Sequence, residues 1–367
     1  MIEPTRNEYE PDEVSPPGAT LADLLEQVGM TQAELADRMG RPRKTINEIV
    51  KGKAQLTPET ALQLERVFDL PASFWNNRER IYREFLARQS EAARLSADDG
   101  WLGELPVREM VKAGWVPSRA QVVEQVRELL NFFGVASPEQ WRRLWRAPEA
   151  AFRKSPAFEA HPGAVAAWLR KGELLAQRLD CRPYDEGRLR GCLQECRALT
   201  LESPQSFVPR LTGLCAAAGV AVVFQPTLSK TPLSGATRWL SADRAMVLLS
   251  LRYKTDDQLW FTFFHEMCHV LRHRKQDVFI EGGSENGPLE DEANRFAADL
   301  LVPPREYAAF VACGRPGWVQ ADAFAKRIGV CPGVVVGRLQ HDGKLPHRHL
   351  NGLKRRLDWR RPPPIFS

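Results

Sequence analysis

The sequence predicts a mainly α-helical protein with a small three-stranded β-sheet, which places it in the α+β class. Residues 20–88 carry apolar side chains at helical spacing, interrupted by glycines, prolines and capping residues. Residues 100–200 continue as short helical segments that prolines separate. After residue 219, three short apolar segments rich in β-branched residues interrupt the pattern before helices resume.

Composition excludes some classes of protein and leaves others open. The chain has 367 residues, of which 43% are hydrophobic and 26% charged, which is typical of a soluble protein with two or three domains. A net charge of +5 does not by itself indicate nucleic-acid binding. No apolar run predicts a membrane helix, and the acidic N-terminal segment lacks the order of a signal peptide. Seven scattered cysteines without CxxC argue against a disulfide framework, so we expect a cytoplasmic protein with no membrane partner.

The N-terminal quarter is expected to be a tail followed by an all-α domain. Residues 1–18 are rich in proline and acidic residues, which predicts disorder. In residues 19–90, Thr31 is placed to cap a helix and Gly40 to end it. The helices are expected at residues 21–28, Gln32–Met39, Arg43–Val50 and 59–68, with a fifth starting at Pro71.

The rest of the chain is expected to form a helical region and then the sheet-containing domain. Residues 91–200 predict a helical linker or sensor region whose tryptophans pack in a core. Residues 346–367 are expected to be a tail. The domain at residues 201–345 should contain strands at 220–224, 233–240 and 245–250, a long helix at 256–274 and a second helix at 289–301.

Residues 31–51 have the pattern of a helix-turn-helix. A small residue, Ala36, stands where the two helices would cross, and Gly40 permits the turn between them. Five basic residues and one acid lie between residues 41 and 53, which suits contacts with DNA phosphates. The alternative is a protein-interaction module with a solvated basic face. The residues expected to contact double-stranded DNA are Arg41, Arg43, Lys44, Thr45, Asn47 and Lys51.

The segment FHEMCHVLRH indicates a metal site. His265 and His269 are four residues apart, so on a helix both imidazoles can reach one Zn²⁺ ion, with Glu266 beside them as a general base. A catalytic zinc needs a third protein ligand. His273 would lie about 12 Å along the axis from His265, too far to share the ion on a straight helix. The remaining candidates are the acidic residues of the next helix, Glu290, Asp291 and Glu292.

FTFFHEMCHVLRH followed by LEDEANRFAADLLVP resembles the ImmA/IrrE family of metallo-endopeptidases over about residues 200–345. The resemblance implies a minimal thermolysin-like zincin domain in which His265, His269 and Glu292 hold Zn²⁺ and Glu266 is the general base. Glu290 is the second choice for the third ligand. The residue that stabilises the oxyanion is open; the candidates are Arg238, His273 and Tyr307.

The stretch from GMTQAELADRMG to LPASFW resembles Cro/repressor-type domains, and in particular HigA-type antitoxins. That resemblance implies an operator as ligand and allows for a homodimer. Near the C-terminus, AFAKRIGVCPGVVVGRLQ also reads like a helix-turn-helix, but its helices carry few basic residues. We therefore expect it to be a structural cap on the catalytic domain.

Together the two halves predict a DNA-binding transcriptional regulator with a zinc endopeptidase that hydrolyses a peptide bond in a partner protein such as a repressor or antitoxin. The expected protein partners are a repressor or a cognate toxin. The alternative is a HigA-like antitoxin or repressor whose zincin domain is a metal-stabilised sensor or dimerisation module without turnover. A purely structural zinc would have four protein ligands and no need for Glu266, which favours the peptidase.

Overall fold

The computed structural model describes residues 13–146, 162–229, 231–273, 279–281, 287–314 and 316–358. The chain divides into two compact units, Met1–Asp98 and Asp99–Ser367. No helix in the described residues is both long and apolar enough to span a lipid bilayer. The predicted tails fall outside the described residues only at 1–12 and 359–367. Residues 346–358 of the expected C-terminal tail are instead folded onto the second unit, where Leu357 is buried and Lys354 pairs with Asp257.

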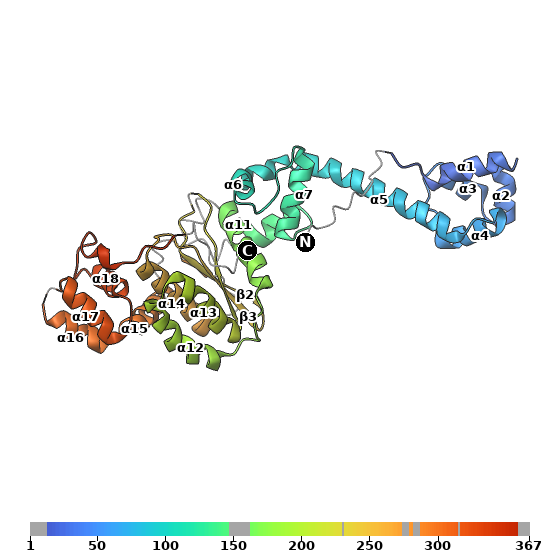
Figure 1. The fold of residues 1–367 in the computed structure, drawn as a ribbon. Coiled ribbons are helices and arrows are strands. Elements are labelled where there is room, and N and C mark those ends of the chain that lie inside the picture. Colours follow the sequence, from blue (N-terminus) through green and yellow to red (C-terminus); the bar gives the residue numbers. More distant parts are fainter. Residues whose placement is uncertain are drawn as a thin grey trace. The chain divides into compact units, whose positions relative to one another are not determined.

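The N-terminal unit consists of five helices, as predicted (Figure 1). Thr31 accepts a hydrogen bond from the backbone N–H of Glu34, and Gly40, at φ 63°, ends the second helix in the left-handed region that favours glycine. The first helix begins at Pro17, so residues 17 and 18 are helical and do not belong to the predicted tail. The helices are α1 (Pro17–Gln27), α2 (Gln32–Met39), α3 (Arg43–Val50), α4 (Pro58–Phe68) and α5 (Ala72–Ala97).

The second unit begins with short helical segments, in agreement with the sequence. Their tryptophans are packing residues: Trp101, Trp141 and Trp168 are almost completely buried, and the rings of Trp101 and Trp141 meet edge to face. The segments are η1 (Asp99–Glu104), α6 (Val107–Lys112), α7 (Val122–Phe133), α8 (Pro138–Trp141), the π-helical turn η2 (Arg142–Arg146), α11 (Pro162–Arg178), α12 (Glu186–Ala198) and η3 (Leu199–Leu201).

The described sheet has four strands in the order β1-β3-β2-β4, one more than the three expected. β1 (Val220–Phe224) runs parallel to β3 (Arg244–Leu249), and β2 (Gly235–Ser241) runs antiparallel to β3. The additional strand, β4 (Phe279–Glu281), pairs antiparallel with the first three residues of β2. A three-residue strand is too short to give a periodic sequence signal.

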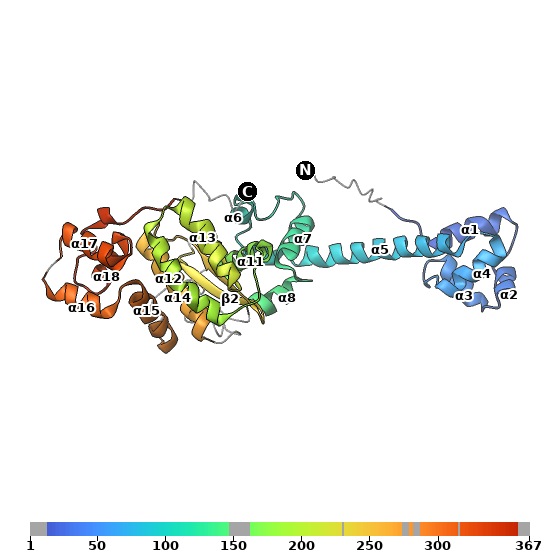
Figure 2. The same cartoon turned by 60° about the horizontal axis from the view of Figure 1, so that its bottom comes forward.

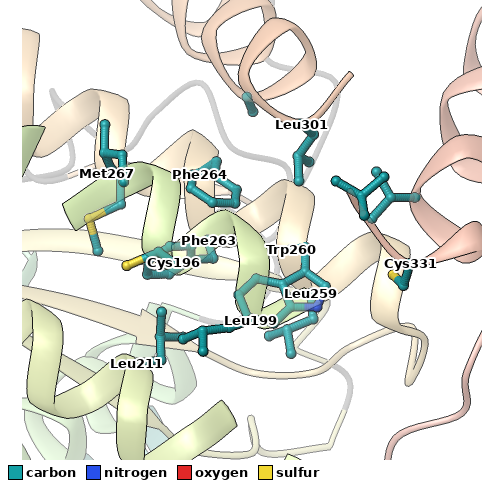
Figure 3. Packing of buried hydrophobic residues seen from close by; sticks show 14 of the residues in the cluster. Cys196, Leu199, Leu211, Leu259, Trp260, Phe263, Phe264, Met267, Leu301 and Cys331 are labelled. Carbon is teal, nitrogen blue, oxygen red and sulfur yellow. The ribbon is translucent and has the colours of Figure 1, made fainter. Parts of the chain in front are cut away.

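Helices cover both faces of this sheet (Figure 2). α13 (Pro204–Ala217) and α14 (Asp256–Arg272) pack on one face, where Val247 and Leu249 of β3 join the main core. α11 packs on the other face, where Gly172 lies directly against the side chain of Leu248. Figure 3 shows the main core, in which Trp260, Phe263, Phe264 and Met267 of α14 pack with Cys196, Leu199 and Leu211.

The C-terminal helices pack on α14. α15 (Pro288–Leu301) lies beside it, and α18 (Pro332–His341) covers another side of it. α18 is buried along Val334, Val335 and Val336, which agrees with the expectation of a structural cap. The remaining elements are α16 (Pro304–Ala312), α17 (Trp318–Ile328) and η4 (Asn351–Leu353).

Candidate metal centre and helix-turn-helix surface

The helix α14 carries the HExxH residues deep in the second unit. It begins with two aspartates, whose negative charge suits a helix N-terminus, and it is buried along most of its length. The exposed fraction is 2% for His265, 1% for His269 and zero for Glu266. Such burial of polar side chains is costly unless they are paired, so the neighbours of these three residues define the site.

The two imidazoles and one carboxylate form a compact cluster. The Nε2 atoms of His265 and His269 lie 3.0 Å apart. Glu290 of α15 places Oε2 3.0 Å from His265 Nε2 and Oε1 3.5 Å from His269 Nε2. In the described part of the chain, these three residues bring ligand atoms within 4.8 Å of one another.

The structure places Glu290, and not the expected Glu292, at the third position of the cluster. Glu292 is 41% exposed, and its Oε1 lies 2.6 Å from Nη1 of Arg272. Residues two apart on an α-helix point about 200° apart, so both carboxylates cannot face the same imidazoles. The packing of α15 on α14 turns Glu290 inward. The neighbouring candidate Asp291 is exposed.

The cluster fits a zinc ion. Ligands at about 2.0–2.1 Å from a tetrahedral zinc lie roughly 3.3–3.5 Å from one another, close to the 3.0–3.5 Å observed. Two histidines and one glutamate leave a fourth position open, as catalytic zinc sites require. Burial lowers the pKa of His269 to about 4, so its imidazole is neutral at pH 7, the form that binds metals.

Glu290 is suited to the same role by its charge. Burial tends to raise the pKa of its carboxyl, but hydrogen bonds to His265 and His269 outweigh burial and lower that pKa to about 2. The cluster therefore combines a carboxylate anion with a neutral imidazole near neutral pH.

Asn294 is a site residue that the sequence analysis missed. Its Oδ1 lies 3.0 Å from Nδ1 of His265. If Nδ1–H donates to this oxygen, Nε2 keeps its lone pair toward the cluster, which is the usual arrangement of a metal-ligating histidine. Asn294 stands four residues after Glu290, and this spacing on one helix face was the available signal.

The side chain of Glu266 extends from α14 toward the sheet. Thr237 of β2 donates a hydrogen bond from Oγ1 to Oε2 of Glu266 at 2.6 Å. Strand β2 approaches so closely at Gly235 that a Cβ there would lie 2.7 Å from Oε1 of Glu266. The strand therefore fixes where this carboxylate stands.

The three candidates for stabilising an oxyanion have different surroundings. Arg238 pairs with Glu173 at 2.6 Å, and Tyr307 is buried beneath the guanidinium of Arg338. His273 directly follows α14, and its Nδ1 lies 2.6 Å from Nδ1 of His269. His273 therefore contacts a residue of the cluster directly.

A cavity of about 600 Å³ lies near His265. Its lining includes Asn294, which contacts Nδ1 of His265, and Phe261, whose ring lies 6.3 Å from the ring of His265. α14, α15 and α18 contribute most of its walls. The cavity is large enough for one or more amino-acid side chains.

The helix-turn-helix folds as expected, with Leu35, Ala36, Ile46 and Ile49 buried between its helices. The expected DNA-binding residues fall into two groups. Arg43, Lys44 and Lys51 are exposed, whereas Arg41, Thr45 and Asn47 are half-buried. Arg41 donates from Nε to Gln63 at 2.5 Å, and Asn47 donates to Gln32 at 3.2 Å, so their side chains are oriented by neighbouring helices.

Comparison with known proteins gives two family matches, one in each unit. Residues 21–75 match the helix-turn-helix family model, and residues 215–340 match the model of the IrrE N-terminal-like domain. Virulence-associated protein A of Dichelobacter nodosus is 39% identical over 61 residues, which are 16% of this chain and 60% of that protein. The match thus spans less than two thirds of that relative.

Two solved structures are similar to about a quarter of the chain. An addiction module antidote protein of the HigA family from Coxiella burnetii is 26% identical, with a TM-score of 0.22, and the match covers 23% of this chain and 91% of that one. An antidote protein of a plasmid maintenance system from Nostoc punctiforme is 24% identical, with a TM-score of 0.23 and coverage of 23% and 93%.

Proposed function

We propose that this chain, a helix-turn-helix domain followed by an IrrE N-terminal-like domain, is a DNA-binding regulator with zinc-dependent endopeptidase activity toward a partner protein. The observation that carries the proposal is the cluster of His265, His269 and Glu290, in which the two buried histidines stand on the same helix as Glu266 and Glu290 reaches them from α15. Glu290 replaces Glu292 in the proposed ligand set.

Each residue of the site has one task. His265, His269 and Glu290 hold Zn²⁺, and a bound zinc would lower the pKa of water and polarise the peptide carbonyl. Glu266 accepts a proton and returns it to the leaving amine nitrogen. The protein substrate extends along the cavity near His265, where Phe261 and the helices around it receive its side chains.

The DNA-binding proposal rests on the exposed basic residues of the helix-turn-helix. Arg43, Lys44 and Lys51 contact phosphates of an operator, and Thr45 and Asn47 at the middle of α3 read base edges. Arg41 orients the turn through Gln63 and contacts the backbone of the DNA. An operator with two half-sites would require a homodimer.

One observation favours the alternative without turnover. The carboxylate of Glu266 is fully buried and hydrogen-bonded to Thr237, so a resting protein keeps its general base against the sheet. Under this alternative, the protein is a HigA-like antitoxin or repressor, and the metal stabilises a sensor or dimerisation module without catalysing cleavage.

The experiment that separates the two functions compares wild type with Glu266→Gln. Both proteins are loaded with zinc and incubated with a proteome-derived peptide library, and the products are identified by mass spectrometry. We expect equal zinc content in both and cleavage by wild type alone. Equal cleavage by both proteins would remove Glu266 from the mechanism, and the absence of cleavage by wild type would favour the alternative.

A further inference from the structure

The end of α14 carries a chain of polar contacts that leads away from the proposed metal site. Nδ1 of His269 lies 2.6 Å from Nδ1 of His273, and Nε2 of His273 lies 3.5 Å from Oε2 of Glu292. Oε1 of Glu292 lies 2.6 Å from Nη1 of Arg272. The side chain of His273 thus connects a proposed ligand, His269, to the ion pair of Glu292 and Arg272.

We propose that Glu292 and His273 are positioning residues that orient His269 for metal binding. The proposal rests on the proposed metal site. It gives a role to Glu292, which lies outside the proposed ligand set but reaches His269 through His273.

The proton positions in this chain follow from the role of His269. To bind a metal through Nε2, His269 must carry its proton on Nδ1. That N–H donates to Nδ1 of His273, which then carries its own proton on Nε2. Nε2 of His273 lies 3.5 Å from Oε2 of Glu292, and the negative charge of Glu292 at this distance favours a proton on that nitrogen. Glu292 therefore favours one tautomer of His273, and His273 in turn favours one tautomer of His269. In that tautomer, Nε2 of His269 carries no proton and can bind metal.

The local backbone makes the first contact possible. α14 ends at Arg272, and His273 leaves the helix in an extended conformation (φ −106°, ψ 165°). Its ring lies 4.7 Å from the ring of His269, with only 2% of the side chain exposed. A buried ring in this position cannot turn freely, so it holds His269 in one orientation.

The two ligand histidines are then both anchored to α15. Asn294 accepts from His265, and Glu292 acts on His269 through His273. Glu290, on the same helix as Asn294 and Glu292, is itself the third proposed ligand. One short stretch of α15 therefore supplies a ligand and orients the other two.

His273 has an alternative role as a further ligand of the same ion. The geometry argues against it because His273 contacts Nδ1 of His269, the ring nitrogen on the side away from the cluster. The two roles also predict different results when Glu292 is changed, since a ligand histidine would keep its metal without that carboxylate.

The test measures zinc affinity by chelator competition, together with the visible spectrum of the Co²⁺-loaded protein, in the full chain. Glu292→Gln and His273→Ala should each lower zinc affinity about 10- to 100-fold and change the Co²⁺ spectrum. The double variant should lose no more than His273→Ala alone, because both changes break one chain of contacts. Asp291→Asn, which removes the same charge from the exposed neighbour of Glu292, should keep wild-type affinity and spectrum.

Wild-type affinity in both single variants, or losses that add up in the double variant, would overturn the proposal. Thermal unfolding of the metal-free proteins controls for misfolding, and Glu292→Gln at a partly exposed position is the safer variant. Glu290→Gln and His265→Ala test the metal site itself. If these two variants also retain zinc, the proposed function fails. If they lose zinc while Glu292→Gln keeps wild-type zinc affinity, only the positioning role is contradicted.

Discussion

Glu290 and Glu292 show how one helix gives two similar side chains different partners. Glu290 faces two buried imidazoles, and Glu292 pairs with Arg272 at a partly exposed site. The difference comes from helix phase, since residues two apart on α15 point about 200° apart and only one of the two positions can face α14. Whether a carboxylate of α15 reaches the imidazoles therefore depends on where its side chain points around the helix axis, and a shift of two residues in the sequence is enough to change its partner.

Thr237 is expected to stabilise the protein by holding the carboxylate of Glu266. Thr237→Val keeps the shape of the side chain but removes the donor to Oε2 of Glu266, a buried acceptor. A lost hydrogen bond to a buried group costs about 1–3 kcal/mol, so thermal unfolding of the second unit should occur at lower temperature. Thr237→Ser retains the hydroxyl and should lose much less. Equal unfolding temperatures for the valine variant and wild type would contradict this role.

At the residue scale the sequence predicts the HExxH residues but not their partners. The spacing of His265 and His269 places both on one helix face whatever the surrounding fold. The choice between Glu290 and Glu292 depends on the rotation of α15 against α14, which local periodicity does not determine. Thr237 could not be predicted, because its contact joins a strand to a helix and Glu266 lies 29 residues further along the chain.

The approach of β2 to α14 depends on a glycine. A Cβ at position 235 would lie 2.7 Å from Oε1 of Glu266 and 2.6 Å from Cγ2 of Thr262. Gly235→Ala is therefore expected to displace the carboxylate of Glu266 and to reduce peptide cleavage, while the zinc content stays unchanged. Gly213→Ala, in α13 with open space around the position, is the control and should cleave as wild type does. Normal cleavage by Gly235→Ala would show that the carboxylate moves freely.

A buried ion pair fastens the C-terminal segment to the start of α14. Nζ of Lys354 lies 2.6 Å from Oδ2 of Asp257, with 12% and 3% of the two side chains exposed. The backbone N–H of Arg355 donates to Asp256, next to that pair. These contacts fix the first turn of the helix that carries the proposed metal ligands.

Removing this ion pair should destabilise the second unit strongly. Lys354→Met leaves the carboxylate of Asp257 buried without its cation, which costs about 3–5 kcal/mol. Lys326→Met breaks an exposed pair with Asp322 on α17 and should cost about 0–1 kcal/mol. Urea unfolding of both variants, followed by circular dichroism, measures the difference. Similar losses in the two variants would mean that the pair at Lys354 is as weak as a surface pair.

At the element scale, sequence patterns predict most helices and three strands because each has its own period or cap. The helices Gln32–Met39 and Arg43–Val50 have the predicted bounds, since Thr31 and Gly40 mark their ends locally. The sheet order places β3 between β1 and β2, and β4 joins from beyond α14. Strand order depends on long-range pairing, so a single sequence does not reveal it.

At the scale of the whole molecule, the chain consists of two compact units with different chemistry. The division at Asp98 lies beyond residue 90, where the sequence analysis ended the first domain, because α5 continues without a break to Ala97. No glycine or proline interrupts residues 73–97, so the sequence carried the signal for one long helix. Each unit has its own hydrophobic core, which predicts that their functions can be changed separately.

That separation can be tested with Arg43→Ala plus Lys44→Ala in the full chain. Both side chains are exposed on α3, and losing two phosphate contacts should reduce the slope of log affinity against log salt by about 2. The measurement is a titration of promoter DNA at several salt concentrations. Zinc affinity and peptide cleavage should not change, since the second unit is untouched.

The control for this prediction is Arg80→Ala plus Arg88→Ala. It removes the same charge from the first unit, but from α5, where both arginines pair with Glu84. We expect this control to keep most of the DNA affinity and nearly the full salt slope, because overall charge contributes less than direct phosphate contact. If both double variants weakened binding equally, affinity would follow net charge rather than the helix-turn-helix surface. A change in zinc affinity in the α3 variant would instead show that the two units are energetically coupled, since a change in one would then alter binding in the other.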